Sequence, residues 1–114
     1  VCGFQTVVEA DGSVYPCDFY VLDEYRLGNL STEDFDSIEK ARHKSNFVKR
    51  SYNHVDSCLQ CEYHFICRGG CYRNRVQISG ESGQNYLCSG YKKFFERCLP
   101  QMKKIAELIS NAQK

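Results

Sequence analysis

Apolar and β-prone residues open the chain in two short runs that flank Asp11-Gly12. Along the first run, residues 4–9, apolar or β-branched side chains alternate with polar ones, and the second run is Val14-Tyr15-Pro16. An Asp-Gly pair between two such runs is typical of a tight β-hairpin. The pattern therefore predicts a hairpin over residues 3–17, followed by an irregular, aromatic-rich loop over residues 18–29.

The next segment has the features of two helices. The first is predicted to begin at Ser31 as its N-cap, with acidic residues in its first turn and a Leu30–Phe35 contact across that end. It should end near Lys44. Ser45 is then placed to cap a second, short helix from Asn46 to Tyr52.

Apolar residues recur every three or four positions over residues 89–109, which predicts a long amphipathic helix. Pro100 lies inside this helix and should kink it. Cys98 lies on the apolar stripe, and we expect it to be a buried core thiol. Ser79–Gly83, before the helix, is expected to be a flexible connection. The stripe consists of Tyr91, Phe94, Phe95, Cys98, Met102, Ile105 and Ile109.

Composition adds one unusual feature, which is the presence of eight cysteines. The length of 114 residues is enough for a single domain. The formal net charge of +1 argues against a nucleic-acid partner or a polybasic membrane surface. No apolar run approaches the ~20 residues of a membrane span. The chain starts at Val1 and shows no secretory leader, so we expect a piece of a longer, cytoplasmic protein.

Four cysteines lie close together in the pattern Cys58-x2-Cys61-x5-Cys67-x3-Cys71. Such spacing suits soft-metal chemistry, either an iron–sulfur cluster or zinc, while disulfides remain an alternative. Gly69-Gly70 would let the backbone approach a bulky inorganic group, or would form an ordinary turn. Three histidines offer Cys3His zinc sites as a further reading: His43, His54 and especially His64.

Cys2 and Cys17 stand near the open end of the predicted hairpin. They should therefore be neighbours in space. Two thiolates held together in this way provide half of a second metal site, although a hairpin disulfide is also compatible with the spacing.

With Cys98 set aside, the spacing of the remaining seven cysteines resembles that of the SPASM domain. This domain is the C-terminal extension of radical S-adenosylmethionine enzymes that modify peptides and proteins. Within that group the chain is similar to the anaerobic sulfatase-maturating enzymes, which oxidise a cysteine or serine of a sulfatase to formylglycine. The segments that carry this similarity are residues 11–21 (DGSVYPCDFYV), residues 27–30 (LGNL) and residues 67–71 (CRGGC).

The resemblance implies two auxiliary 4Fe-4S clusters. Cys2, Cys17 and Cys71 would bind the first cluster, whose fourth ligand would lie upstream of this chain. The ligands of the second cluster would be Cys58, Cys61, Cys67 and Cys88. Asp18 matches an acid that lies by the substrate and takes a proton from the target side chain. From its position alone, Asp18 is better explained as a solvated loop acid or turn former, and only the resemblance favours a role by the substrate.

The resemblance also implies a radical S-adenosylmethionine catalytic domain in cis, which would carry that cofactor and a third 4Fe-4S cluster. A sulfatase or other peptide substrate and an electron acceptor would be further partners. The chain has no Cys-x3-Cys-x2-Cys motif, so by itself it should not cleave S-adenosylmethionine.

Two other functions remain open. One is the SPASM domain of a thioether-forming peptide maturase, and the other is a zinc-stabilised structural or protein-interaction module. Zinc is also a possible substitute for iron in aerobically purified protein. The expected fold is a small, metal-stabilised α+β domain spanning residues 1–114. Its elements are a β-hairpin (3–17), a helical region (31–52), a cysteine-rich loop (57–73) and a C-terminal helix (89–109).

Overall fold

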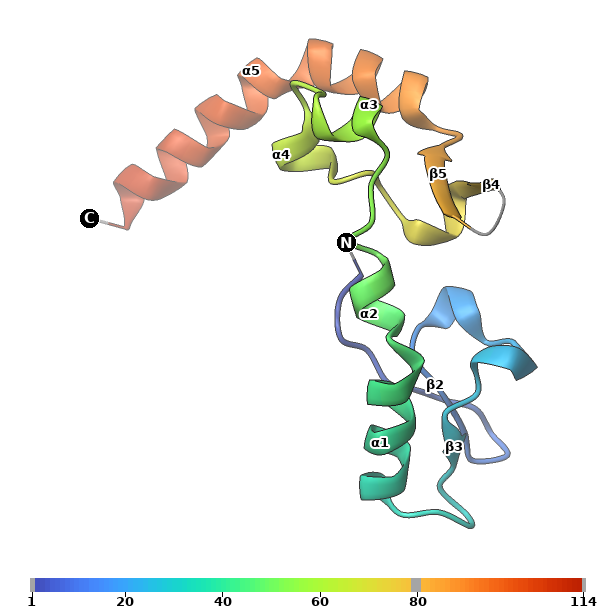
Figure 1. Cartoon of the computed structure of the whole chain (residues 1–114). Coiled ribbons are helices and arrows are strands. Elements are labelled where there is room, and N and C mark those ends of the chain that lie inside the picture. The colour runs from blue at the N-terminus through green and yellow to red at the C-terminus, as the bar shows by residue number, and fades with distance from the viewer. Residues whose placement is uncertain (1, 79–80, 114) are drawn as a thin grey trace. The chain divides into compact units, whose positions relative to one another are not determined.

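The computed structural model describes residues 2–78 and 81–113 of this small mixed α/β protein. Its elements fall into two compact units. The first unit consists of the described residues up to Asn53 together with Cys71–Arg73. The second consists of His54–Gly70 and the described residues from Asn74 onward. Figure 1 labels strands β2 and β3 and helices α1 and α2 in the first unit, and α3 to α5 with β4 and β5 in the second.

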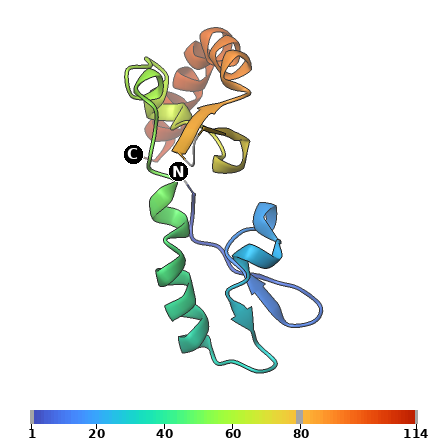
Figure 2. The same cartoon turned by 45° about the vertical axis from the view of Figure 1, so that its right-hand side comes forward.

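A small antiparallel sheet forms one side of the first unit. Gly12 has a φ of +85° in the turn between the first two strands, a left-handed conformation that glycine adopts without steric cost. The predicted hairpin is confirmed, with shorter strands than residues 3–17 (Figure 2). A third strand corrects the expected loop over residues 18–29, since two residues are too few to show alternation. The strands are β1 (Val7–Val8), β2 (Ser13–Tyr15) and β3 (Gly28–Asn29), in that order.

The apolar core of the first unit lies between this sheet and α1 (Phe35–Ser45). Val14 of β2 and Ile38 of α1 are each 1% exposed, and Leu27 completes the cluster. Leu30 and Ala41 pack against it. Helix α1 runs alongside the strands in both views (Figure 1, Figure 2).

The start of α1 differs from the prediction. Asp34, not Ser31, is the N-cap, and its carboxylate accepts a hydrogen bond from the backbone N–H of Ser37 at 2.8 Å. Residues before it form a turn instead, in which the N–H of Glu33 donates to the carbonyl of Asn29 at 2.8 Å. The carboxylate of Glu33 accepts the N–H of Asn29 in return. These two hydrogen bonds between Asn29 and Glu33 occupy backbone and side-chain groups that would otherwise form the first turn of a helix starting at Ser31.

The predicted Leu30–Phe35 contact is also wrong. Phe35 is 66% exposed, while Leu30 packs on the core. The later start of the helix rotates the first turn, so that Ile38 rather than Phe35 faces inward.

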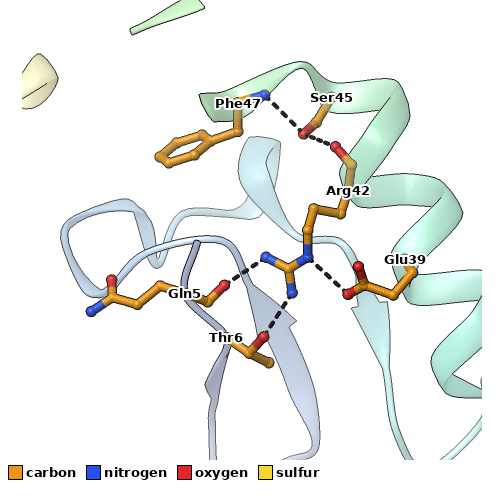
Figure 3. Close-up of polar contacts among 6 residues, drawn as sticks. All are labelled: Gln5, Thr6, Glu39, Arg42, Ser45 and Phe47. Atoms are coloured by element: carbon orange, nitrogen blue, oxygen red, sulfur yellow. Dashed lines mark hydrogen bonds and ion pairs between the residues drawn. The ribbon is translucent and has the colours of Figure 1, made fainter. Parts of the chain in front are cut away.

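A break separates α1 from α2 (Phe47–Arg50), which is shorter than the predicted 46–52. Asn46 has a φ of 51°, a left-handed conformation that ends α1. The hydroxyl of Ser45 accepts the backbone N–H of Phe47 at 3.3 Å and donates to the carbonyl of Arg42 (Figure 3). The predicted cap at Ser45 is wrong by one residue, because Asn46 is the N-cap of α2, although the Ser45 hydroxyl still accepts the first N–H of that helix.

Two short 3-10 turns occupy the aromatic segment that follows β2. Tyr20 and Phe47 are buried, and their ring centroids lie 4.9 Å apart in an edge-to-face arrangement. Tyr25 lies 4.7 Å from Tyr20. These rings extend the packing of the first unit beyond the small apolar core. The turns are η1 (Asp18–Tyr20) and η2 (Asp23–Tyr25).

The second unit begins with the cysteine-rich segment that was expected to be a loop over residues 57–73. It contains two single-turn helices, α3 (Asp56–Leu59) and α4 (His64–Cys67). A 3-10 turn, η3, covers Tyr72–Asn74. The Cys-x2-Cys and Cys-x5-Cys segments are too short to show helical periodicity, so these turns were not predictable.

An antiparallel hairpin follows, formed by β4 (Arg75–Ile78) and β5 (Glu81–Asn85). The flexible connection predicted at Ser79–Gly83 is wrong for Glu81–Gly83, which belong to β5. Residues 79–80 lie outside the described residues. The Ser/Gly-rich composition of this segment indicated a linker because it lacks the β-branched residues that favour strands.

The long C-terminal helix is confirmed as α5 (Cys88–Ala112), with Pro100 inside it. The helix changes direction partway along its length (Figure 1). Cys98 is half-buried and not the buried core thiol that we expected. Every residue over 101–113 is exposed, because the apolar stripe continues past the elements that pack beside it. No helix in the described part of the chain combines the length and apolarity that crossing a membrane requires.

The two units differ in what they bury. All six buried hydrophobic side chains of the described chain belong to the first unit. In the second unit, the buried side chains among those described are polar, namely those of Arg75 and Asn85, each 4% exposed. The second unit therefore lacks the apolar core that stabilises the first, at least among its described side chains.

Candidate functional site

Four cysteines of the second unit line one partly open cavity. All four are half-buried. Burial raises the pKa of the Cys58 thiol, and the charges of the neighbouring cysteines act in the same direction. The remaining lining comes from aromatic side chains of α5 and from residues of the α3–α4 segment. The four cysteines are Cys58, Cys61, Cys67 and Cys88, the residues predicted as one ligand set.

Local structure explains how these thiols converge. The backbone N–H of Cys61 donates to the carbonyl of Cys58 at 3.2 Å, which curls the Cys-x2-Cys pair back on itself. Cys67 is the last residue of α4, and Cys88 is the first residue of α5. Each cysteine thus lies in, or within two residues of, a short helical turn or a helix end.

A run of left-handed residues follows Cys67. Arg68, Gly69 and Gly70 have φ values of 49°, 75° and 62°. A Cβ atom added at Gly70 would lie 2.7 Å from Nδ2 of Asn85, so the position has no room for a side chain. The N–H of Gly70 donates to the carbonyl of Cys67. The two glycines are therefore required by the backbone conformation of this loop.

The β4–β5 hairpin holds this loop in place. The guanidinium of Arg75 donates to the carbonyls of Arg68, Gly69 and Gly70 at 3.2–3.3 Å. Asn85, which pairs with Arg75 across the hairpin, donates from Nδ2 to the carbonyl of Gly69 at 3.2 Å. The positive charge of Arg75 also opposes the rise in the pKa of Cys58. The sequence analysis did not find Arg75 or Asn85, because nothing in the sequence marked the hairpin.

Of the three histidines considered as zinc ligands, His64 lines the four-cysteine cavity. Its Nε2 lies 3.2 Å from Nδ1 of His54, and the two rings meet edge to face. Burial, followed by the charge of Arg75, lowers the pKa of His54 and favours its neutral form. His43 lies on exposed α1 surface in the first unit.

The other predicted ligand set, Cys2, Cys17 and Cys71, lies in the first unit. Cys2 and Cys17 are half-buried, and Cys71 is exposed. Burial raises the pKa of the Cys17 thiol, and the Asp18 carboxylate and, to a smaller extent, Cys2 act in the same direction. The three cysteines thus belong to one compact unit, and their role as one ligand set stays a prediction.

Arg42 anchors the segment between Cys2 and β1 (Figure 3). Its Nη1 donates to the carbonyl of Gln5 at 2.6 Å, and its Nη2 donates to the hydroxyl of Thr6 at 2.8 Å. Nε forms an ion pair with Glu39 one turn earlier on α1. Since Arg42 is 6% exposed, these contacts fix the strand that leads to Cys2 against the helix.

Asp18 lies directly beside this ligand set. Its Oδ1 accepts hydrogen bonds from Sγ of Cys17 at 3.3 Å and from the backbone N–H of Phe19 at 3.1 Å. The side chain is exposed at the first position of η1. A carboxylate in this position is accessible to a molecule bound from outside.

The donor set and the cavity fit an iron–sulfur cluster. Four cysteine thiolates are the donor set of a 4Fe-4S cluster, and His64 is a further side chain in the lining that could bind a metal. The left-handed Gly69-Gly70 segment brings the backbone close to the cavity without side chains in the way. Among residues 2–78 and 81–113, no group of three or more His, Cys, Asp or Glu side chains is placed to hold a single metal ion.

A model of the SPASM family, described as an iron–sulfur cluster-binding domain, matches residues 2–62. The fold and the sites define the class of this protein as a small α+β domain with two groups of cysteines. The chain belongs to the SPASM family.

Curated relatives are anaerobic sulfatase-maturating enzymes of two types. The cysteine-type enzyme of Clostridium novyi is 36% identical over 113 residues, which cover 98% of this chain and 30% of that protein. The serine-type enzyme of Bacteroides thetaiotaomicron is 35% identical over 115 residues, which cover 98% of this chain and 28% of that protein. The chain therefore spans less than a third of the length of these relatives.

Solved structures with the same fold include native anSMEcpe with bound AdoMet and Cp18Cys peptide. It superimposes with a TM-score of 0.81 at 40% sequence identity, covering 95% of this chain and 30% of that protein. The complex of native anSMEcpe with AdoMet and Kp18Cys peptide gives a TM-score of 0.80 at 41% identity, covering 93% of this chain and 30% of that protein.

Proposed function

We propose that residues 1–114 form the auxiliary-cluster domain of a longer radical S-adenosylmethionine enzyme that oxidises a cysteine or serine of a sulfatase to formylglycine. The observation that carries this proposal is the cavity lined by Cys58, Cys61, Cys67 and Cys88. Membership of the SPASM family and the similarity to both types of sulfatase-maturating enzyme support it.

In this proposal each unit holds one 4Fe-4S cluster. The four cavity cysteines are the ligands of one cluster. Cys2, Cys17 and Cys71 are ligands of the other, whose fourth ligand comes from outside this chain. A cluster ligated only by thiolates supplies one-electron transfer, with a potential set by burial and by hydrogen bonds to its sulfurs.

The residues of this chain would act on the second half of the oxidation. After hydrogen abstraction, the target residue must lose one more electron and one proton. The electron would leave through the two cysteine sites to an external acceptor. Asp18 would take the proton, since its carboxylate is exposed next to Cys17 and can approach a bound peptide.

The catalytic domain in cis would carry S-adenosylmethionine and the third cluster, so this chain alone would not be active. We place the enzyme in the cytoplasm, where thiols stay reduced and available for iron. The sulfatase peptide is the proposed substrate. No nucleic-acid or membrane partner is included in this proposal.

Substitution of the cavity cysteines in the intact parent enzyme tests the electron-transfer role. Cys58→Ala, Cys61→Ala or Cys67→Ala should abolish formylglycine formation while largely sparing uncoupled cleavage of S-adenosylmethionine. Leu108→Ala, at an exposed position near the end of α5 and outside the cavity lining, is the control. A normal yield of formylglycine from any of the three cysteine variants would overturn the proposal.

Metal analysis distinguishes the alternatives. After anaerobic reconstitution this chain should be brown, absorb at about 400 nm and contain about seven to eight irons with as many sulfides. A colourless protein with one or two zinc atoms would instead indicate a structural or interaction module. Mass spectrometry of the modified peptide separates formylglycine from the thioether that a peptide maturase of the other kind would form.

A further inference from the structure

Four aromatic rings surround the guanidinium of Arg50, the last residue of α2. We call this group the Arg50 cage. The attraction between a cation and the faces of aromatic rings stabilises such an arrangement, more so when water is excluded. The ring centroids lie 4.7 Å (Phe47), 4.8 Å (Tyr25), 5.1 Å (Tyr72) and 5.5 Å (Tyr20) from Cζ of Arg50.

The cage leaves part of the guanidinium without hydrogen bonds. Nε and Nη2 of Arg50 are buried and have no hydrogen-bond partner among the described residues. Ring faces attract the positive charge but do not replace an oxygen or sulfur acceptor. Burying charged N–H groups without an acceptor is unfavourable, so the arrangement favours an anionic acceptor at this place.

The cage is connected to every cysteine of the first ligand set through neighbouring residues in the chain. Ser51, which follows Arg50, accepts the backbone N–H of Cys2. Each of the other two cysteines stands within a few residues of a cage ring. These neighbouring pairs are Cys17 with Tyr20, and Cys71 with Tyr72.

The pKa of Tyr20 reflects both the cage and two of the cysteines. Burial raises the pKa of Tyr20 to about 12, with Cys2 and Cys71 acting in the same direction and Arg50 opposing them. Tyr20 therefore interacts with Arg50 and with two of the three predicted ligands. Arg73 also lies over the ring of Tyr20, at 5.5 Å, but its side chain is exposed and water screens its charge.

We propose that Arg50 has two roles at the first cluster. It positions the segments that carry the cysteine ligands, and it is the buried positive charge that balances the negative charge of the cluster. Through the cage and Ser51, α2 gathers the three chain segments that carry Cys2, Cys17 and Cys71. The unpartnered N–H groups donate to sulfur of the bound cluster, whose thiolate ligands make it anionic. A cation beside a cluster stabilises its reduced form, so Arg50 raises the reduction potential of the first cluster.

This inference rests on the proposed iron–sulfur function, and a redox titration of the intact, reconstituted parent enzyme tests it. The potential of each cluster is followed by electron paramagnetic resonance in the unmodified enzyme, Arg50→Met and Arg50→Lys. Lys49→Met is the matched control, because it removes the same charge from the neighbouring residue, which is exposed and outside the cage. Arg50→Met should lower the potential of the first cluster only, and Arg50→Lys should restore most of the difference.

The outcomes separate the two proposals. Absence of a first cluster from the unmodified enzyme would overturn the proposed function itself. If that cluster is present, equal shifts in Arg50→Met and Lys49→Met, or no shift in either, would overturn only the role of Arg50. If Arg50→Met does not retain the first cluster, Arg50→Lys provides the test. Iron content of Arg50→Lys equal to that of the unmodified enzyme supports the role of Arg50 as a counter-charge, and loss of the cluster from Arg50→Lys contradicts that role.

Discussion

The backbone N–H of Cys2 donates a hydrogen bond to Oγ of Ser51, at 2.8 Å and across 49 positions of the sequence. Ser51 is fully buried. Its hydroxyl also donates to the carbonyl of Val48 at 2.6 Å, so the side chain is held in one orientation at the end of α2. A predicted cluster ligand near the start of the chain is thus positioned by the same helix end that carries Arg50.

Ser51→Ala should therefore weaken the first site. The substitution leaves a partly buried N–H at Cys2 without this acceptor, a change that costs about 1–3 kcal/mol. We expect a lower free energy of unfolding and preferential loss of iron from the first site, measured by denaturation and by iron analysis after anaerobic reconstitution. Ser110→Ala, on exposed α5, should change neither quantity. Equal iron retention in both variants would show that this hydrogen bond does not position Cys2.

Much of this organisation was predictable from the sequence, where spacing or periodicity was long enough. Asp11-Gly12 marked the first hairpin, and the apolar repeat marked α5. The grouping of Cys58 with Cys88 came from the resemblance to a family and agrees with the cavity. These features depend on local turn chemistry or on regular repetition, both of which a single sequence records.

Other features were missed because they arise from tertiary contacts. The β4–β5 hairpin lies in a Ser/Gly-rich segment with no strand-like alternation, so the loop support by Arg75 was not visible. The aromatic residues around Arg50 lie far apart in the sequence and were assigned to a loop or to short helices. The start of α1 moved from Ser31 to Asp34 because Glu33 bonds back to Asn29. Both positions offer good capping residues, and propensity alone does not choose between them.

Gly70→Ala should disrupt the second site. An alanine at φ +62° loses about 1–2 kcal/mol from backbone conformation, and its Cβ would lie 2.7 Å from Nδ2 of Asn85. We expect reduced iron binding at the four-cysteine site, measured as the iron-to-protein ratio after reconstitution. Gly90→Ala is the matched control, since a Cβ there meets nothing within 4 Å and a helical alanine adds up to about 1 kcal/mol of stability. Normal iron content in Gly70→Ala would contradict the requirement for a left-handed glycine.

Shortening Ile38 should destabilise the first unit in proportion to the atoms removed. Ile38 is 1% exposed in the core with Val14 and Leu27. Ile38→Val should cost about 0.5–1.5 kcal/mol and Ile38→Ala about 2–5 kcal/mol, as measured by urea unfolding of the reconstituted chain. Phe35→Ala on the same helix removes a larger side chain that is 66% exposed, and should stay within about 0.5 kcal/mol of the unmodified protein. A larger effect of Phe35→Ala than of Ile38→Ala would mean that α1 packs through a different face.

Removal of iron should affect the two units unequally. The first unit has an apolar core of its own, whereas the described side chains of the second unit bury Arg75 and Asn85 and no apolar residue. Metal binding then provides much of the folding free energy of the second unit, as in other small metal-binding domains.

Hydrogen exchange measured before and after anaerobic chelation should show at least about tenfold faster exchange of amides in α3, α4 and the first turns of α5. Amides of β1, β2 and α1 should keep most of their protection, and renewed loading with iron and sulfide should restore the original rates. Unchanged exchange in α3 and α4 after complete removal of iron would show that the second unit is stable without its cluster, and that its cysteines bind metal without supporting the fold.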